Sequence, residues 1–278
     1  MTASSFDMVA VRDRDLDDVT ALVKTLNWPH RREDIALFMR LGGGRVMRDR
    51  SGDLLGVALW WAFEPAAARL GLVMVDPARQ GRGIGRRLVE RVLDDAAGRS
   101  MKLLATEAGK PLYDSLGFTE IGACRQYQGV YGGEPCQDPN IRPAGPDDLP
   151  AILALDAAAF GAGRAPVMHG LMACGRTAVL DDGSGVAGFA MERDFGRGTV
   201  VGPIVAPSEV AAVGLFQALA RPGFVRVDIP VGGDALARHL VDCGLSAAGS
   251  DLPVMVRGDW PDPDGETRLF ALSSHALG

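Results

Sequence analysis

The sequence predicts an α/β protein that consists of two consecutive copies of one fold. One observation behind this prediction is a strand, a glycine-rich turn and an amphipathic helix that follow one another over residues 70–96. Another is an internal repeat, in which Val11–Leu22 has a counterpart in Ile141–Ile152, 130 residues later. With 278 residues, the chain is long enough for two ordinary domains.

The strand and the helix are recognised by their apolar residues. Leu70–Val75 is a short, continuous apolar run, which is typical of a strand covered on both faces. Beyond the turn, apolar residues repeat at helical spacing until Gly98. They are Ile84, Leu88, Val89, Val92, Leu93 and Ala96. Between strand and helix, Gly81, Gly83 and Gly85 allow several backbone N–H groups to point at one anion without an intervening Cβ. The segment therefore predicts a phosphate-binding site.

The class of phosphate ligand follows from the surroundings of these glycines. No Lys-Ser/Thr pair follows the turn, which argues against a Walker-type site, and the strand comes too late for the first strand of a Rossmann unit. The strand end carries Val75 and Pro77, and the pattern Gln80-x-x-Gly83-x-Gly85 comes directly after it. This arrangement resembles motif A of the GNAT superfamily of acetyl-CoA-dependent N-acetyltransferases.

A second segment agrees with this resemblance. Leu112–Phe118 reads Leu-Tyr-Asp-Ser-Leu-Gly-Phe and resembles the end of GNAT motif B. Met101–Ala105 supplies a strand between the two motifs, and the resemblance extends over residues 7–130. The alternative is a generic α/β unit with a glycine-rich turn.

The resemblance implies an α/β (α+β) fold with two tandem GNAT-like domains, each a mixed, mostly antiparallel central sheet flanked by helices. We expect an acetyltransferase domain at residues 1–135 and a degenerate GNAT-like domain at residues 136–278, as in tandem bacterial GNAT proteins. Turn-rich residues 132–140 connect them. The apolar segment Leu269–Gly278 is expected to pack against the body of the protein.

The second copy has lost the phosphate-binding turn. Two further echoes align the copies, since Val75–Pro77 recurs as Val205–Pro207 and Leu116–Phe118 recurs as Cys243–Leu245. In place of Gln80, Gly83, Gly85 and Tyr113, the second copy has Val210, Val213, Leu215 and Leu240. Losing two charge-assisted hydrogen bonds removes about 3–6 kcal/mol. The second copy is therefore predicted not to bind the cofactor.

Composition limits the class of protein. The net charge of −6, without a block of Lys or Arg, argues against nucleic-acid binding. No apolar run of about eighteen residues is present, so we expect no membrane span, and residues 1–7 lack the features of a secretory signal. The four cysteines show no Cys-x-x-Cys pairs, which argues against a metal site and a disulfide framework. We expect a cytoplasmic protein, whose oligomeric state is open.

The family pattern implies acetyl-CoA as the cofactor and a direct transfer of its acetyl group to an amine. Backbone groups of Val73, Met74 and Val75 would contact the pantetheine arm, and Thr106 is a further expected contact. The turn and the helix start would hold the pyrophosphate, helped by the helix dipole. The residues concerned are Gln80, Gly81, Arg82, Gly83, Ile84, Gly85 and Arg86. The arginines, with Arg87, would either add charge near the phosphates or simply be solvated.

The resemblance makes Tyr113 the general acid that protonates the departing thiolate. The alternative is a half-buried helix residue with an ordinary hydroxyl partner. An alkylamine is almost wholly protonated at neutral pH, so the reaction also needs a proton acceptor. Glu107 is the first candidate, followed by Glu64 and His30, whereas the alternative is that such turn residues belong to the surface.

The acceptor pocket in this fold is shaped by the first helices and by the strand before motif A. Trp28, His30, Trp60 and Trp61 fall in these segments. Aromatic walls suit a cationic amine through cation–π contact. Because Trp60 and Trp61 are adjacent on a strand, at least one of them is expected in the core.

The predicted function is that of an N-acetyltransferase acting on a primary amine of a small molecule or a peptide. One alternative is a non-catalytic sensor of acyl-CoA, and another is an oligomeric scaffold in which the second half makes interfaces. In the second half, Asp156, Arg164 and Asp228 are candidates for a shared cleft. His169 and His239 are expected to be structural or exposed.

Overall fold

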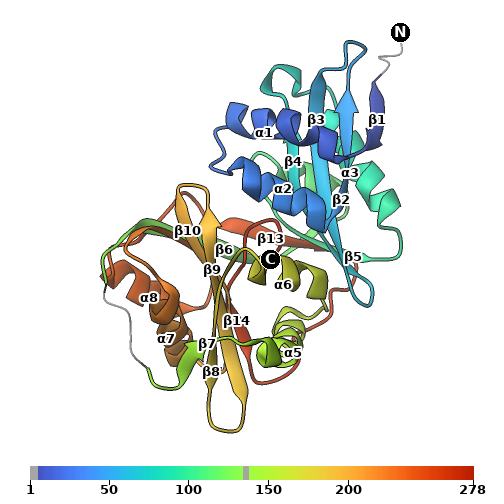
Figure 1. Ribbon diagram of the computed structural model, residues 1–278. Helices are drawn as coiled ribbons and strands as arrows, with labels where there is room; N and C mark the ends of the chain where they lie inside the picture. The colour runs from blue at the N-terminus through green and yellow to red at the C-terminus, as the bar shows by residue number, and fades with distance from the viewer. Residues whose placement is uncertain (1–5, 134–137) are drawn as a thin grey trace.

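The computed structural model describes residues 6–133 and 138–278, and Figure 1 shows two lobes that join near the middle of the molecule. The helices and strands of the first half are β1 (Asp7–Ala10), α1 (Leu16–Thr25), α2 (Arg32–Leu41), β2 (Gly43–Arg48), β3 (Leu54–Phe63), β4 (Ala67–Val75), α3 (Ile84–Asp95), β5 (Ser100–Leu104), α4 (Lys110–Ser115) and β6 (Thr119–Tyr131).

The second half repeats this order of elements. Its helices and strands are β7 (Ile141–Pro143), α5 (Leu149–Phe160), α6 (Ala165–Met172), β8 (Gly175–Asp181), β9 (Val186–Phe195), β10 (Gly198–Ala206), α7 (Glu209–Leu219), β11 (Gly223–Pro230), α8 (Asp234–Asp242), β12 (Ser246–Ala247), β13 (Leu252–Arg257) and β14 (Arg268–Ala271). Each half thus runs strand, two helices, three strands, helix, strand, helix and strand. The prediction of two copies of one mixed α/β fold is confirmed.

The two copies begin with the same capped turn. In the first copy, the Asp15 carboxylate accepts a hydrogen bond from the Arg12 N–H at 2.8 Å. In the second, the Asp148 carboxylate accepts one from the Gly145 N–H at 2.7 Å. Such a carboxylate satisfies a backbone donor that would otherwise have no partner at the helix entrance. The repeated Asp-Asp segments of the sequence therefore have a shared structural cause.

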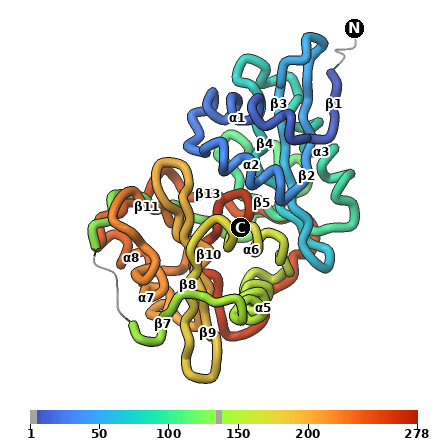
Figure 2. The backbone as a smooth tube through the Cα atoms, viewed as in Figure 1, coloured from blue at the N-terminus to red at the C-terminus, as the bar shows by residue number. Residues whose placement is uncertain are grey.

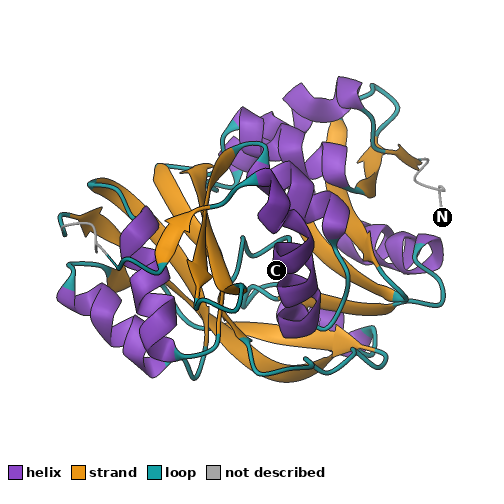
Figure 3. Ribbon diagram, turned by 60° about the horizontal axis from the view of Figure 1, so that its bottom comes forward, coloured by secondary structure: helices purple, strands orange, loops and turns teal. Residues whose placement is uncertain are grey.

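All strands belong to one sheet, with helices on both of its faces (Figure 3). The strand order is β1-β2-β3-β4-β5-β13-β6-β11-β10-β9-β8-β7, with β12 beside β6 and β14 beside β10. Most neighbouring strands are antiparallel, whereas β4 with β5 and β10 with β11 are parallel. The mixed, mostly antiparallel sheet expected from the sequence is confirmed.

The two halves exchange strands. β13 belongs to the second half, yet it lies between β5 and β6 of the first, with Val254 opposite Leu104 on one side and Gly122 on the other. β6 in turn pairs with β11 along its length, from Cys124 to Tyr131. Each lobe therefore contains a strand from beyond the boundary predicted at residue 135. The sheet is therefore built across the two predicted domain ranges.

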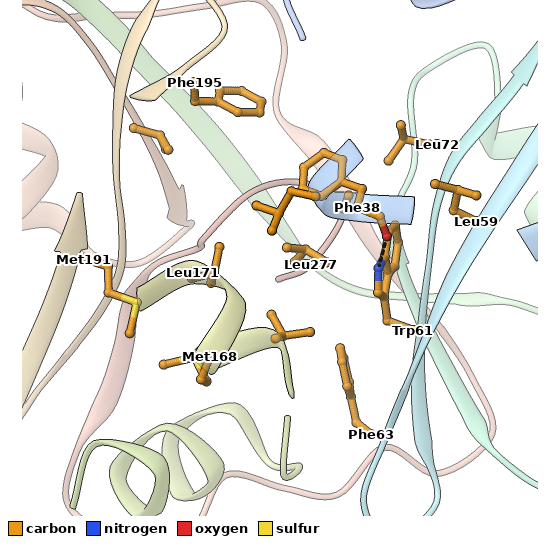
Figure 4. Close-up of a cluster of buried hydrophobic side chains, with 14 of the residues drawn as sticks. Phe38, Leu59, Trp61, Phe63, Leu72, Met168, Leu171, Met191, Phe195 and Leu277 are labelled. Atoms are coloured by element: carbon orange, nitrogen blue, oxygen red, sulfur yellow. Dashed lines mark hydrogen bonds between the residues drawn. The ribbon is translucent and has the colours of Figure 1, made fainter. Parts of the chain in front are cut away.

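A shared apolar core joins the lobes (Figure 4). Trp61 of β3 is fully buried there, and its indole N–H donates a hydrogen bond to the Phe38 carbonyl at 3.0 Å. Met168 and Leu171 of α6 and Leu277 belong to the same cluster. Because this core contains side chains from both copies, the lobes have no separate cores at this face.

The last residues of the sequence lie between the lobes, as Figures 1 and 2 show. The buried Arg69 of β4 donates hydrogen bonds to the carbonyls of His275 at 2.8 Å and Ala276 at 3.4 Å. The buried Arg164 pairs with Asp156 at 2.9 Å and donates to the Leu277 carbonyl at 2.9 Å. The expected packing of the apolar final segment against the body is confirmed.

The strand exchange predicts that a side chain of β13 stabilises the first lobe. Met255 is fully buried in the core beneath α3. Replacing it by alanine should lower the free energy of unfolding by about 2–5 kcal/mol, through lost transfer energy and the cavity left behind. Urea denaturation measures this change. The Val210→Ala variant is the control, because Val210 is 82% exposed and its truncation should cost no more than about 0.5 kcal/mol. Equal costs at the two positions would contradict the prediction.

Candidate active site

β4 carries a bulge in its middle. Leu59 of β3 lies opposite Gly71, whereas Val57 lies opposite Met74, so Leu72 and Val73 together face one residue of β3. Leu72 has a φ of +48°, which is uncommon for a residue with a side chain. A bulge of this kind takes its backbone groups out of the regular ladder. Those groups are then free to bind something else.

The bulge lies where β4 and β5 separate. The two parallel strands pair only from Ala67 opposite Ser100 to Arg69 opposite Lys102. Beyond this point β4 continues to Val75 and β5 continues to Leu104, but the two strands no longer pair with each other. A gap therefore opens between the carboxyl ends of the two strands, which is where ligands of α/β proteins commonly bind.

A cavity of about 330 Å³ adjoins this gap, and both halves of the chain line it. The first half contributes Trp28, Pro29, His30, Leu70, Gly71, Leu72, Leu104, Thr106, Gln126 and Gln128. The second half contributes Phe195, Gly196, Arg197, Phe224, Arg226, Leu252, His275 and Ala276. Of the described residues that line the cavity, none is Asp or Glu.

The structure brings together two of the four aromatic residues predicted for the acceptor. Trp28 and His30 line the cavity, with their rings 5.8 Å apart. Trp61 points into the shared core, and Trp60 packs on the other face of the sheet, against the core beneath α3. Neither lines the cavity. The expectation that one of the adjacent tryptophans lies in the core is confirmed for Trp61.

His30 is held as a neutral imidazole. Its ring packs edge-on against Phe195 at 5.1 Å, and its Nδ1 atom is buried without a hydrogen-bond partner among the described residues. Burial, together with the positive charge of Arg226, lowers the pKa of His30 to about 4. A histidine with so low a pKa is a weak proton acceptor, which makes His30 a poor general base.

The glycine-rich turn has the geometry that the sequence predicts. Gly81 and Gly83 have φ values of +73° and +75°, which favour glycine, and open space lies where their Cβ atoms would be. The amide of Gln80 donates to the Val75 carbonyl at 3.3 Å and closes the turn. Gly83 is the N-cap of α3, whose start has neither a side-chain cap within the described residues nor an acidic residue in its first turn. The first N–H groups of this helix are thus available to an anion.

Two of the three arginines beside this turn already have contacts within the protein. Arg86 donates a hydrogen bond to the Ser115 hydroxyl at 2.6 Å and lies 3.5 Å from the Glu90 carboxylate. The guanidinium of Arg87 lies 5.9 Å from the centre of the Phe6 ring. Arg82 is exposed at the turn itself.

The predicted general acid is buried near Thr106. Tyr113 of α4 is buried against Phe118, and burial raises the pKa of its hydroxyl. A Cβ on Gly109 would lie 3.1 Å from the Thr106 hydroxyl and 3.2 Å from a ring carbon of Tyr113. Thr106 lines the cavity, whereas Tyr113 does not and belongs to the apolar cluster beneath α3.

Two of the three predicted general bases do not reach the cavity. Glu107 is exposed and does not line it. The backbone of Glu64 pairs with Gly163 at 2.8 Å, and its side chain is likewise outside the cavity lining. His30 alone of the three candidates is at the site.

Three second-half residues at the site were missed or only partly recognised in the sequence. Arg226 and Asp228 alternate with apolar residues in β11, and His275 follows β14. Asp228 is fully buried, and Arg226 donates hydrogen bonds of 2.8 to 3.1 Å to its carboxylate. His275 Nε2 lies 3.1 Å from Oδ1 of Asp228. Charged residues that alternate within an apolar strand indicate a buried polar face, and this was the available signal for Arg226 and Asp228.

The other second-half candidates lie elsewhere. Asp156 and Arg164 form their buried pair below the final segment and do not line the cavity. His169 is exposed on α6. The His239 ring on α8 packs against Phe216 and lies 3.4 Å from the Cys243 sulfur.

The matching gap in the second half is filled by the chain itself. β10 and β11 pair only at Thr199 and Val200 before they separate. β14 lies in the space between them, pairing with β10 from Ile204 to Ala206, and the Leu272 N–H donates to the Asp228 carbonyl at 2.8 Å. The start of α7 is capped by its own Ser208 side chain. The two copies therefore differ both in the gap and at the helix start.

Among the described residues, no group of three or more His, Cys, Asp or Glu side chains is placed to hold a metal ion. None of the helices described combines the length and apolar character needed to cross a membrane.

Comparison with known proteins agrees with this architecture. Two models described as acetyltransferase (GNAT) domain match the chain, one over residues 43–120 and the other over residues 152–271. The chain therefore belongs to the GNAT acetyltransferase family and contains two GNAT domains in tandem. It is 26% identical over 282 residues to the uncharacterized N-acetyltransferase YitH of Bacillus subtilis strain 168, and the match covers 98% of each chain.

Solved structures show the same fold along the whole chain. A proposed acetyltransferase from Pyrococcus horikoshii superposes with a TM-score of 0.80 at 20% identity, covering 100% of this chain and 98% of that one. A tandem GNAT protein from the clavulanic acid biosynthesis pathway gives a TM-score of 0.66 at 15% identity, covering 91% and 98%.

The neutral state of His30 predicts a pH-dependent stability. The pKa of a histidine in an unfolded chain is about 6.5, whereas that of His30 in the folded protein is about 4. The unfolded state therefore binds more protons as the pH falls, and His30 alone should cost about 2 kcal/mol between about pH 7.5 and about pH 5. Urea unfolding at both pH values should show a smaller loss of stability for His30→Gln than for the wild type. The exposed His169 supplies the control His169→Gln, which should keep the wild-type pH dependence. Equal losses in both variants would argue against a buried neutral His30.

Proposed function

We propose that this protein transfers the acetyl group of acetyl-CoA directly to a primary amine, in its first GNAT domain. The observation that carries this proposal is the open gap between β4 and β5, which continues into the uncapped, glycine-rich start of α3. Family membership gives the class of reaction. The open gap supports this location for the reaction.

The residues present fit the donor. The bulge leaves backbone groups of Val73, Met74 and Val75 to the pantetheine arm, in the manner of an added strand. Met74 and Ile84 turn their side chains into the core, so their contribution would come from the backbone. The amides from Gln80 to Arg86 would hold the pyrophosphate at the positive end of α3, and Thr106 would lie at the end of the arm that carries the acetyl group.

The second domain supports the proposal by contrast. Its corresponding gap contains β14. At the start of α7, one of the backbone N–H groups that could bind an anion already donates a hydrogen bond to the Ser208 hydroxyl. An arm of pantetheine would have to displace a paired strand. We therefore expect one molecule of acetyl-CoA for each chain.

Tyr113 would act when the thiolate departs. The amine nitrogen attacks the carbonyl carbon, the C–S bond breaks, and the thiolate takes the phenolic proton. Burial raises the pKa of Tyr113 and keeps its hydroxyl protonated. Burial also raises the pKa of a thiol. The pKa values of the proton donor, Tyr113, and of the acceptor, the coenzyme A thiolate, are therefore both raised. A donor in a site of low dielectric stabilises charge that develops on sulfur more strongly than water does.

The cavity limits the acceptor. A volume of about 330 Å³ is at the small end of ligand pockets, which suits a small molecule or the first residue of a peptide. The lining combines Trp28, Phe195 and Phe224 with Gln126 and Gln128. Arg197 is also exposed at the lining and forms no ion pair with the described residues. We therefore propose an amine whose other groups are neutral or anionic, in preference to a polyamine.

The function is tested by measuring free coenzyme A thiol in the presence of acetyl-CoA and a panel of amines. We expect amine-dependent release with amino acids, amino sugars or short peptides, and slower release with spermidine. Acetyl-CoA that binds without release for any amine would instead favour the sensor.

Gly85→Ala provides a matched variant for this assay. A Cβ at Gly85 meets only ordinary contacts, 3.6 Å from Val75 and 3.7 Å from Leu112, and alanine favours a helix by up to about 1 kcal/mol. The variant should therefore keep or gain stability while its affinity for acetyl-CoA falls. The control is Gly214→Ala in α7, whose Cβ would approach the flexible end of Ile141. Calorimetry should give unchanged affinity for the control, and unchanged affinity for both would refute the proposed pyrophosphate site.

Replacing Tyr113 by phenylalanine tests the general acid. We expect the turnover number to fall by about 10²-fold or more, with the affinity for acetyl-CoA unchanged, because only the hydroxyl is removed. Tyr127→Phe is the control, since Tyr127 lies on β6 between Gln126 and Gln128 and does not line the cavity. Wild-type turnover in Tyr113→Phe would exclude the assignment.

A further inference from the structure

We propose that His275, placed against the buried carboxylate of Asp228, is the general base that takes the proton of the acceptor amine. The second domain would then supply a catalytic residue to the donor site of the first. This inference rests on the proposed acetyl transfer and concerns the part of the reaction for which the sequence offered only Glu107, Glu64 and His30.

The need for a base follows from the substrate and from the cavity. An alkylamine has a pKa of about 10.4 and reaches the enzyme as an ammonium ion. Its nitrogen cannot attack until a proton leaves. The described lining of the cavity contains no carboxylate, and the only groups there that can gain a proton at neutral pH are imidazoles. Of these, His30 is a weak base because its pKa is about 4, which leaves His275.

His275 lies in ion-pair distance of a buried carboxylate. Its side chain is 29% exposed at the cavity, and its buried Nε2 atom lies 3.1 Å from Oδ1 of Asp228, although the two are not aligned as a hydrogen bond. The described residues give Nδ1 no hydrogen-bond partner. If Nε2 carries the proton on the Asp228 side, Nδ1 is left as the acceptor for the ammonium proton.

Asp228 is kept ionised, so it can stabilise the imidazolium. Burial opposes ionisation of this carboxyl, but the electrostatic interaction with the His275 ring and the positive charge and hydrogen bonds of Arg226 outweigh it and lower the pKa of Asp228. Among the described residues, His30 also interacts electrostatically with His275, while the guanidinium groups of Arg69 and Arg193 bind the backbone carbonyls of His275 and Ser273. Asp228 is therefore the negative partner beside the ring when it gains its charge.

The main chain of His275 is fixed to the strand that would bind the donor. Arg69 of β4 donates to the carbonyls of His275 and Ala276, as described above. Two residues further along β4, a Cβ on Gly71 would lie 3.1 Å from the Cα atom of Ala276. The His275 segment thus packs directly against the β4 bulge, beside the place where the acetyl group is expected.

The proton balance is closed by groups already named. The ammonium gives one proton to Nδ1 of His275, and the freed lone pair attacks the carbonyl carbon to form the C–N bond. As the C–S bond breaks, the thiolate takes the proton of Tyr113, and the nitrogen gives up its second proton, which restores Tyr113. The imidazolium then releases its proton, so that one proton enters the solvent in each cycle.

The test uses the full-length protein and two kinds of acceptor. In His275→Gln, kcat/KM for an alkylamine should fall by about 10²-fold or more, while the affinity for acetyl-CoA by calorimetry stays unchanged. With methoxyamine, which is mostly neutral at pH 7, the variant should approach wild-type turnover, because its nitrogen can attack without first losing a proton. A merely structural role would lower both rates together.

Two further variants make the result decisive. His169→Gln, an exposed histidine on α6, should behave as the wild type with both amines. Asp228→Asn should show the same selective loss as His275→Gln. If wild-type protein releases no coenzyme A with any amine, the proposed function itself fails. If the wild type is active and His275→Gln equals it on alkylamines, or loses both activities equally, the base assignment is overturned while acetyl transfer stands.

Discussion

The early end of the pairing between β4 and β5 is the constraint on which the rest of the molecule depends. Two parallel strands that separate inside a protein leave backbone N–H and C=O groups without partners, and buried groups of this kind must be satisfied. In the second domain β14 enters the matching gap and pairs with β10. Among the described residues of the first domain, no strand fills the gap, which adjoins the cavity and leads to the glycine-rich turn. The second domain thus satisfies its unpaired strand groups with its own chain, whereas the first leaves them available to a ligand.

The cavity walls depend on the union of the two domains. The strand exchange makes one sheet of both copies, and the final segment lies between Arg69 of the first domain and Arg164 of the second. Interfaces between independent domains are usually smaller and more polar. A continuous core and a continuous sheet therefore hold the side chains that face one another across this cavity. Such rigid support keeps reacting groups in the geometry that catalysis requires.

Local patterns in the sequence were sufficient for the strand, the turn, the helix and the repeat, because each depends on residues close together in the chain. Gly81 and Gly83 could be identified in this way. The placement of β13 could not be predicted, because the alternation of apolar and polar residues identifies a strand but not the strand with which it pairs. His275 gave no local signal, because its partner Asp228 lies on a distant strand. Trp60 and Trp61 show the remaining ambiguity, since alternation predicts opposite faces but not which face meets the cavity.

The exchange of β13 also has a consequence for how the protein is made. While the chain emerges from the ribosome, β5 and β6 are complete long before residues 252–257 have been synthesised. Their facing edges must wait, with unpaired backbone exposed, until nearly the whole polypeptide is available. Pairings between such distant segments form slowly, and open strand edges invite association with other chains. The first domain can therefore complete its sheet only after residues 252–257 have been made.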